Sequence, residues 1–171
     1  MTTYVALLRA VNVGGTGKLP MADLKRLCQD AGFADVRTYI ASGNVVLAGA
    51  QSEAQVKAAL EAALGDYAGK PVAVLVRTAA ELADVLAANP FPDAEAASIA
   101  VFFLDAPPPA DALDHVAGRA DEELHLGRRE IYVRYPGGMG RSKLRIPAAK
   151  AGTARNLNTV AKLAAMARSP G

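Results

Sequence analysis

The sequence predicts an α+β protein made of two ferredoxin-like halves that pack together. Short apolar or alternating runs, typical of strands, are interleaved with stretches of helical periodicity. In the first half these follow the order β-α-β-β-α-β, which defines the ferredoxin-like unit. A β-α-β-β order then occurs a second time, and this half is expected to be incomplete and to end in a helix. The expected halves are residues 1–77 and 78–171.

In the first half, the spacing of apolar residues predicts the strands and helices, and capping residues and glycines predict where the helices begin or end. An apolar run reads as a buried strand, and the helix after it keeps apolar residues at helical spacing until Gly32. Ser52 and Gln55 form a capping box that opens a second helix, and Gly65 is expected to end it. The expected strands are residues 4–11, 36–41, 45–47 and 72–76, and the expected helices are residues 21–31 and 52–64.

The second half opens with a helix behind another capping box, Thr78 with Glu81. The Asn-Pro-Phe-Pro run at 89–92 stops that helix. The chain then departs from the first half, because a glycine-rich loop and a short segment at 143–146 precede a terminal helix from about Asn156. The expected strands are residues 99–104, 122–126 and 131–135, with a short helix at 112–117.

Composition indicates a protein with a real core and no disulfide. Hydrophobic residues make up 51% of the 171 residues, and Cys28 is the single cysteine. It shares an apolar helical stripe, so we expect a buried and chemically quiet thiol. The first residues lack the signal-peptide pattern, and no apolar stretch reaches transmembrane length. We therefore expect a soluble cytoplasmic protein without a membrane partner.

Charge is distributed unevenly along the chain. From Gly127 onward there are ten lysines and arginines against one acidic residue, Glu130, a net charge of +9. Residues 1–126 hold nine basic and sixteen acidic residues, a net charge of −7. Such asymmetry favours one face made for an anionic partner. The alternative is a solvated surface whose two halves attract each other.

A glycine loop runs from Asn12 to Lys18, between the first strand and the first helix. Gly14 and Gly15 let backbone N–H groups approach a ligand, and a helix N-terminus favours anions. The loop does not match a Walker phosphate loop, which requires glycine where Asn12 stands and Ser or Thr where Leu19 stands. A tight strand-to-helix turn is the alternative interpretation.

Three more polar clusters are candidate parts of an anion site. One surrounds the turn at 42–44, where Ser and Asn side chains alternatively hold the turn's own backbone. One is the glycine loop at 135–143, alternatively a flexible surface loop, and one opens the last helix, where capping explains a single residue. The candidate ligand-binding residues are Arg9, Asn12, Gly14, Gly15, Lys18, Tyr39, Ser42, Asn44, Ser142, Lys143, Arg155, Asn156 and Asn158.

Catalytic and metal-binding patterns are missing from the sequence. The two histidines, His115 and His125, lie outside these clusters, and no Cys/His metal spacing or paired carboxylate occurs in a loop. We assign no catalytic residues and expect no metal and no cofactor. Whether the protein is an enzyme stays open.

The motifs resemble the bacterial domain-of-unknown-function 1697 family over nearly the whole chain, in the same order. The family usually has Trp where Leu157 stands, and often a larger residue than Ala41. The resemblance implies an α+β fold built from ferredoxin-like units, and it brings no established activity. The matching segments are LRAVNVGG at 8–15, TYIASGNV at 38–45, NPF at 89–91, SKL at 142–144 and TARNLNT at 153–159.

The leading functional hypothesis is a protein that binds an anionic ligand, either a phosphorylated small molecule or a nucleotide. The ligand would lie in a cleft between the halves, on which Arg9, Asn12, Asn44, Lys143 and Arg155 are expected to converge. The alternatives are RNA or DNA binding through the basic C-terminal third, an enzyme acting on a phosphorylated substrate, and a structural module with no ligand. Nucleic acid ranks below a small ligand, because Trp is absent and most of the nine Phe and Tyr residues lie outside strand centres. The oligomeric state stays open.

Overall fold

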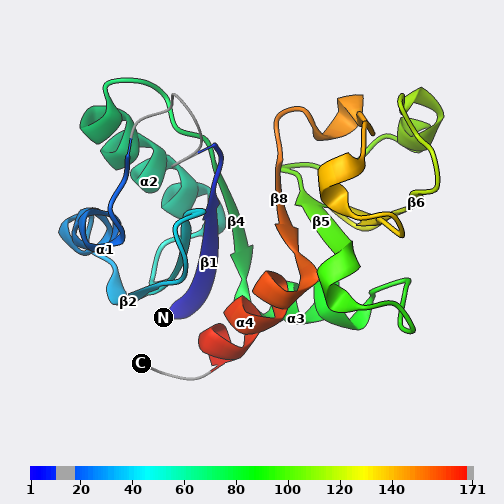
Figure 1. The fold of residues 1–171 in the computed structure, drawn as a ribbon. Helices are drawn as coiled ribbons and strands as arrows, with labels where there is room; N and C mark the ends of the chain where they lie inside the picture. Colours follow the sequence, from blue (N-terminus) through cyan, green and yellow to red (C-terminus); the bar gives the residue numbers. More distant parts are fainter. Residues whose placement is uncertain (11–17, 169–171) are drawn as a thin grey trace. The chain divides into compact units, whose positions relative to one another are not determined.

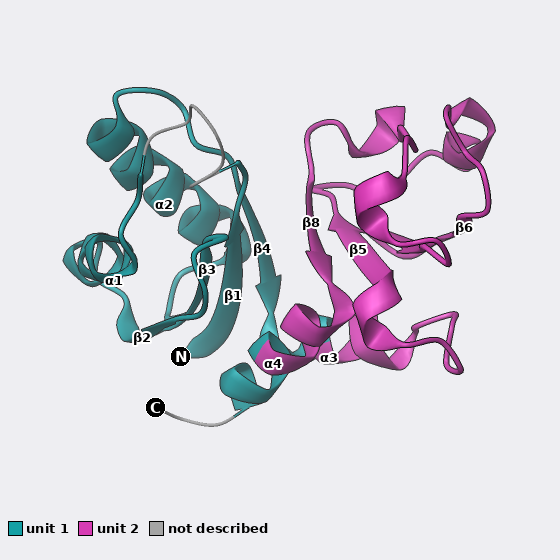
Figure 2. Ribbon diagram, in the orientation of Figure 1, with its two compact units in different colours: residues 1–82, 163–171 teal, residues 83–162 magenta. Residues whose placement is uncertain are grey.

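The computed structural model describes residues 1–10 and 18–168 (Figure 1). Within these ranges it contains two four-stranded antiparallel sheets and four α-helices. The chain divides into two compact units, one of residues 1–82 with 163–171 and one of residues 83–162 (Figure 2). The predicted α+β fold class is therefore confirmed.

The first sheet follows the predicted β-α-β-β-α-β order. Its strands lie in the order β2-β3-β1-β4, and every neighbouring pair is antiparallel. Strand β1 is central because its apolar run is buried on both faces. The elements are β1 (Thr2–Leu8), α1 (Met21–Asp30), β2 (Ala34–Thr38), β3 (Asn44–Gly49), α2 (Glu53–Ala68) and β4 (Val74–Thr78).

Helix α2 has the predicted beginning and a different end. The Ser52 hydroxyl accepts from the Gln55 N–H at 3.3 Å, and the Gln55 side chain accepts from the Ser52 N–H at 2.9 Å. The prediction that Gly65 ends the helix was wrong, since α2 continues to Ala68. Gly69 ends it instead with φ of +71°, a conformation that glycine adopts without steric cost.

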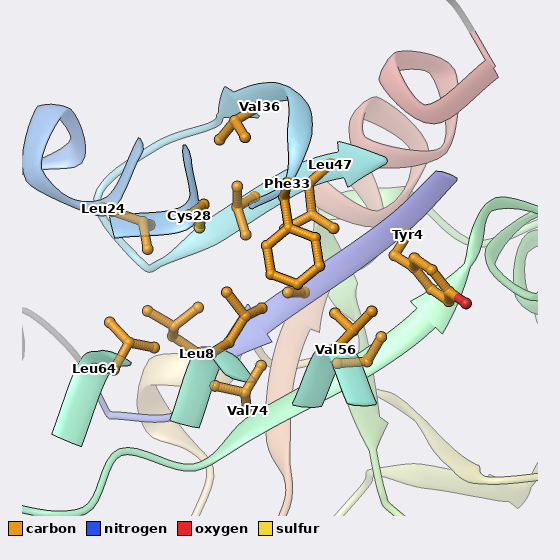
Figure 3. Close-up of a cluster of buried hydrophobic side chains, with 14 of the residues drawn as sticks. Tyr4, Leu8, Leu24, Cys28, Phe33, Val36, Leu47, Val56, Leu64 and Val74 are labelled. Carbon is orange, nitrogen blue, oxygen red and sulfur yellow. The ribbon is translucent and has the colours of Figure 1, made fainter. Parts of the chain in front are cut away.

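The core of the first unit lies between its sheet and helices α1 and α2. Helix α1 contributes Leu24 and Cys28, and α2 contributes Val56 and Leu64 (Figure 3). These side chains pack with Leu47 of the sheet and are almost completely buried. The prediction that Cys28 is buried is confirmed, and burial raises the pKa of its thiol to about 12.

The second sheet has four strands in the order β6-β7-β5-β8. Its connections hold only 3-10 turns in the described structure, so the helix predicted at 112–117 is a 3-10 turn, Ala112–His115. Residues 153–156 were expected to open the terminal helix. They form the fourth strand instead, because Thr153–Asn156 pairs with β5. The strands are β5 (Ile99–Phe103), β6 (Glu123–Leu126), β7 (Glu130–Arg134) and β8 (Thr153–Asn156).

One helix follows directly after the fourth strand of each sheet. Helix α3 (Ala79–Ala87) begins with the predicted capping box, in which the Thr78 hydroxyl accepts from the Glu81 N–H at 3.1 Å. Helix α4 (Leu157–Arg168) begins in the second unit, and its residues from Leu163 belong to the first. None of the helices in the described ranges has the length and apolar character that a bilayer span requires.

Candidate ligand-binding pocket

Of the first glycine loop, only Lys18 lies within the described residues. Asn12, Gly14 and Gly15 lie outside the described residues, so their predicted role is not addressed by the structure. Arg9 and Lys18, which flank them, are both exposed in the first unit.

The turn at 42–44 uses the side chain of Asn44 for its own structure. Asn44 is completely buried, and its amide nitrogen donates to the Tyr39 carbonyl and to the Ser42 hydroxyl, both at 2.9 Å. The amide nitrogen has two hydrogens, and these two bonds use both. Its donors therefore stabilise the turn.

The polar cluster at 153–159 is mostly built into β8 and the start of α4. Arg155 is buried and donates to the Thr153 hydroxyl at 2.7 Å and to the Ala154 carbonyl at 2.9 Å. Burial lowers the pKa of its guanidinium to about 10. The Asn156 side chain accepts from the Thr159 N–H at 2.9 Å and so caps α4, whereas Asn158 is exposed.

The second glycine loop forms one wall of a pocket of about 610 Å³, which we call the glycine-loop pocket. The other wall is the segment that precedes β6. Both walls belong to the second unit. The lining residues are Gly118, Ala120, Asp121, Glu122, Gly137, Gly138, Arg141, Ser142 and Lys143.

Hydrogen bonds hold the two walls together. The Ser142 hydroxyl donates to the Glu122 carboxylate, and the other oxygen of that carboxylate accepts from the Ala120 N–H at 2.6 Å. Just outside the pocket, the backbones of Ala117 and Arg145 exchange hydrogen bonds of 3.0 and 2.8 Å. The pocket is therefore shaped before any ligand arrives.

One glycine is required where the walls meet. Gly118 has φ of +68°, and a Cβ atom placed there would overlap the Lys143 carbonyl oxygen. Only glycine permits both the backbone conformation and this close approach.

The charge on Glu122 is stabilised inside the wall. The hydrogen bond from Ser142, followed by that from the Ala120 N–H, lowers the pKa of the Glu122 carboxyl below its ordinary value. Burial raises the pKa of the neighbouring Tyr135 hydroxyl, and the negative charge of Glu122 raises it further. A carboxylate with a lowered pKa is a weak general base at neutral pH, so the Ser142–Glu122 pair favours a structural role.

Three exposed charged residues of the lining have no such partner. Among the described residues, the side chains of Arg141, Lys143 and Asp121 make no hydrogen bond or ion pair. Ser142 and Lys143 were predicted from the glycine loop, whereas Asp121 and Glu122 were not. Both lie in a run of acidic residues, and the side chains of such runs are usually solvated, so the sequence did not indicate that they line a pocket.

The family model described as a protein of unknown function, DUF1697, matches residues 1–132. The chain belongs to this family. No curated protein matches it. Among solved structures, it is similar to the conserved bacterial protein SP0830 from Streptococcus pneumoniae, with 24% identity, a TM-score of 0.81, and coverage of 97% of this chain and 98% of that one. This likeness concerns the fold.

The DUF1697 match ends within β7, between the two walls of the pocket. The acidic wall lies inside the matched residues, and the second glycine loop lies beyond them.

A smaller pocket of about 280 Å³ in this DUF1697 protein is lined in part by Pro90 and Phe91 of the Asn-Pro-Phe motif. Two of its charged residues, Arg134 and Glu123, form an ion pair at 3.0 Å through Nη1 of the arginine, so their charges neutralise each other. Within the described ranges, no three His, Cys, Asp or Glu side chains lie close enough to hold a metal ion.

Proposed function

We propose that this protein binds a phosphorylated small molecule in the glycine-loop pocket. The observation that carries the proposal is the pair Arg141 and Lys143, two exposed cations on one wall of a pre-shaped pocket, with no side-chain partner among the described residues. Arginine and lysine are the side chains that bind phosphate most often, the first through a planar fork and the second as a point charge.

The pocket's construction supports a small ligand. Its volume of about 610 Å³ falls within the usual range for small-molecule sites. A Cβ atom at Gly138 would meet nothing within 4 Å, so a ligand can come close to the backbone of the loop there. Because hydrogen bonds already hold the two walls together, less conformational entropy is lost when a ligand binds between them.

Binding is favoured over catalysis and over nucleic acid. Catalysis by Ser142 would need a base to take its proton, and the lowered pKa of Glu122 works against that role. A nucleic-acid backbone would bring several phosphates near Asp121, whose charge repels them. The expected convergence of Arg9, Asn12, Asn44, Lys143 and Arg155 on one cleft between the halves stays a prediction, and the proposal does not use it.

The test measures binding of inorganic phosphate and pyrophosphate by calorimetry and by thermal shift. The wild type is compared with the double variant Arg141→Ala/Lys143→Ala. The control is Arg128→Ala, which removes an exposed arginine from the β6–β7 turn of the same unit. We expect saturable binding by the wild type and the control, with stabilisation growing as the logarithm of ligand concentration.

The double variant should bind at least tenfold more weakly. Equal affinity in the wild type and the double variant would overturn the proposal, and so would the absence of binding to the wild type. Short single-stranded RNA is the comparison ligand. If it binds more tightly than pyrophosphate and depends on the same two residues, nucleic acid is the ligand instead.

A further inference from the structure

The two walls of the glycine-loop pocket carry opposite charges. The loop wall contributes Arg141 and Lys143, and the wall before β6 contributes Asp121 and Glu122. For inorganic phosphate the charges of the carboxylates are unfavourable, since they repel the anion even where a P–OH group could donate a hydrogen bond to one of them. The carboxylates therefore indicate which kind of group, other than phosphate, the ligand places beside them.

Only one of the two carboxylates is available to a ligand. Both oxygens of Glu122 accept hydrogen bonds, one from the Ala120 N–H and one from the Ser142 hydroxyl, and the residue is buried. Asp121 is exposed and has no hydrogen-bond or ion-pair partner among the described residues.

The Asp121 carboxylate lies against the opposite wall. A Cβ atom on Gly137 would be 3.4 Å from its Oδ2 and 3.9 Å from its Oδ1. Those are ordinary contact distances, so the carboxylate lies beside the glycine loop. It forms no ion pair with Arg141 or Lys143. The pocket therefore offers cations and an unused acceptor on facing segments.

An ionised carboxylate only accepts hydrogen bonds, so its ligand partner must donate them. The commonest such donors on phosphorylated small molecules are hydroxyl and ammonium groups. An ammonium group would be repelled by Arg141 and Lys143 on the facing wall. Hydroxyl groups carry no such penalty, and adjacent hydroxyls of a sugar are a common partner of a carboxylate.

We infer that the ligand is a phosphate ester of a sugar, with its phosphate at Arg141 and Lys143 and its hydroxyl groups at Asp121. This inference rests on the proposed function, because it places the phosphate at the same cations. The shared chemistry is a phosphorylated sugar, which occurs both in free sugar phosphates and in nucleotides. Asp121 is then the residue that distinguishes a sugar phosphate from inorganic phosphate.

The experiment measures the affinities of the full chain for inorganic phosphate and ribose 5-phosphate by calorimetry. The variant is Asp121→Ala, at an exposed position whose side chain has no hydrogen-bond or ion-pair partner among the described residues. The matched control is Asp114→Ala, which removes the same charge from an exposed position outside the pocket. We expect the wild type and the control to bind ribose 5-phosphate at least tenfold more tightly than inorganic phosphate.

In Asp121→Ala this preference should fall below threefold, while the affinity for inorganic phosphate stays equal or increases because a repulsive charge is gone. Equal binding of both probes by the wild type would overturn the inference and leave the proposed function standing. Absence of binding to both probes would overturn both. Tighter binding of phosphoethanolamine than of ribose 5-phosphate would identify an amine ligand and overturn the inference.

A parallel titration with adenosine 5′-monophosphate separates the two sources of the shared chemistry. Tighter binding than that of ribose 5-phosphate supports a nucleotide, and equal or weaker binding supports a free sugar phosphate. In both cases the inference requires that Asp121→Ala reduces the preference for the sugar-bearing probe. An unchanged preference in that variant would overturn it.

Discussion

The Ser142 hydroxyl donates a hydrogen bond to the Glu122 carboxylate, and this bond joins two segments that lie twenty residues apart in the sequence. Ser142 belongs to the glycine loop after β7, and Glu122 precedes β6. The Ser142 oxygen also accepts from the Leu144 N–H at 3.1 Å, which orients its proton toward the carboxylate. One side chain thus fixes the shape of the loop and its distance from the opposite wall.

Stability should decrease in acid through Glu122. The pKa of Glu122 is lowered in the folded protein, so its carboxylate contributes stability above the ordinary carboxyl pKa of 4.5. That contribution is lost as the pH falls below this value, through the lower pKa of the folded state. We expect the thermal unfolding temperature of the wild type to fall more steeply between pH 5 and pH 3 than that of Glu122→Gln. A loss of about 1 kcal/mol corresponds to a shift of a few degrees in a domain of this size.

The control for this prediction is Glu95→Gln, which changes an exposed carboxylate in the same unit. Its unfolding temperature should follow the wild type across the same pH range. Parallel curves for the wild type and Glu122→Gln would mean that the carboxylate is equally easy to protonate in the folded and unfolded states.

Gly118 should be far less tolerant of alanine than Gly69, although the two have nearly the same backbone conformation. Their φ values are +68° and +71°, so each alanine meets a similar left-handed penalty of roughly 1–2 kcal/mol. A Cβ at Gly69 meets nothing within 4 Å, whereas one at Gly118 overlaps the Lys143 carbonyl. We expect Gly118→Ala to lower the free energy of unfolding at least about 1 kcal/mol further, measured by denaturant titration.

A second measurement makes this comparison informative about the pocket. Gly118→Ala must move the wall that carries Lys143, so phosphate binding should weaken in Gly118→Ala and not in Gly69→Ala. Equal losses of stability in the two variants would show that the walls separate without cost.

Local sequence signals predicted the elements that depend on neighbouring residues. Ser52 with Gln55 and Thr78 with Glu81 were recognised as helix starts because a capping box is complete within four residues. Strand β8 was missed for the opposite reason. Thr153–Asn156 has no apolar run or alternation, and it becomes a strand because the edge of β5 offers hydrogen-bond partners.

The same distinction applies to the pocket. Ser142 and Lys143 could be predicted because glycines and cations are adjacent in one loop. Asp121 and Glu122 reach that loop only through tertiary contacts, such as the bond from Ser142 to Glu122. No pattern within the acidic segment distinguishes such a carboxylate from a solvated one.

Asn44 should matter for stability, whereas Asn158 should not. Asn44 is completely buried, and its loss leaves the Tyr39 carbonyl and the Ser42 hydroxyl without their donor. We expect Asn44→Ala to lower the free energy of unfolding by about 1–3 kcal/mol. Asn158 is exposed, so Asn158→Ala should stay within about 0.5 kcal/mol of the wild type. Denaturant titration of both variants compares them, and similar values would contradict the turn-holding role of Asn44.

Cys28 should resist thiol reagents in the folded protein. Its side chain is completely buried beside Leu24, and burial raises the pKa of the thiol from 9.0 to about 12. The thiolate is the reactive form, so this rise lowers the thiolate fraction at pH 8 strongly even before access is considered. Labelling with an aromatic disulfide reagent should therefore be very slow for the native protein and complete within the mixing time in strong denaturant. Because folding protects the thiol, intermediate urea concentrations should accelerate labelling in proportion to the unfolded fraction. Rapid labelling without denaturant would contradict the packing of α1 against the first sheet.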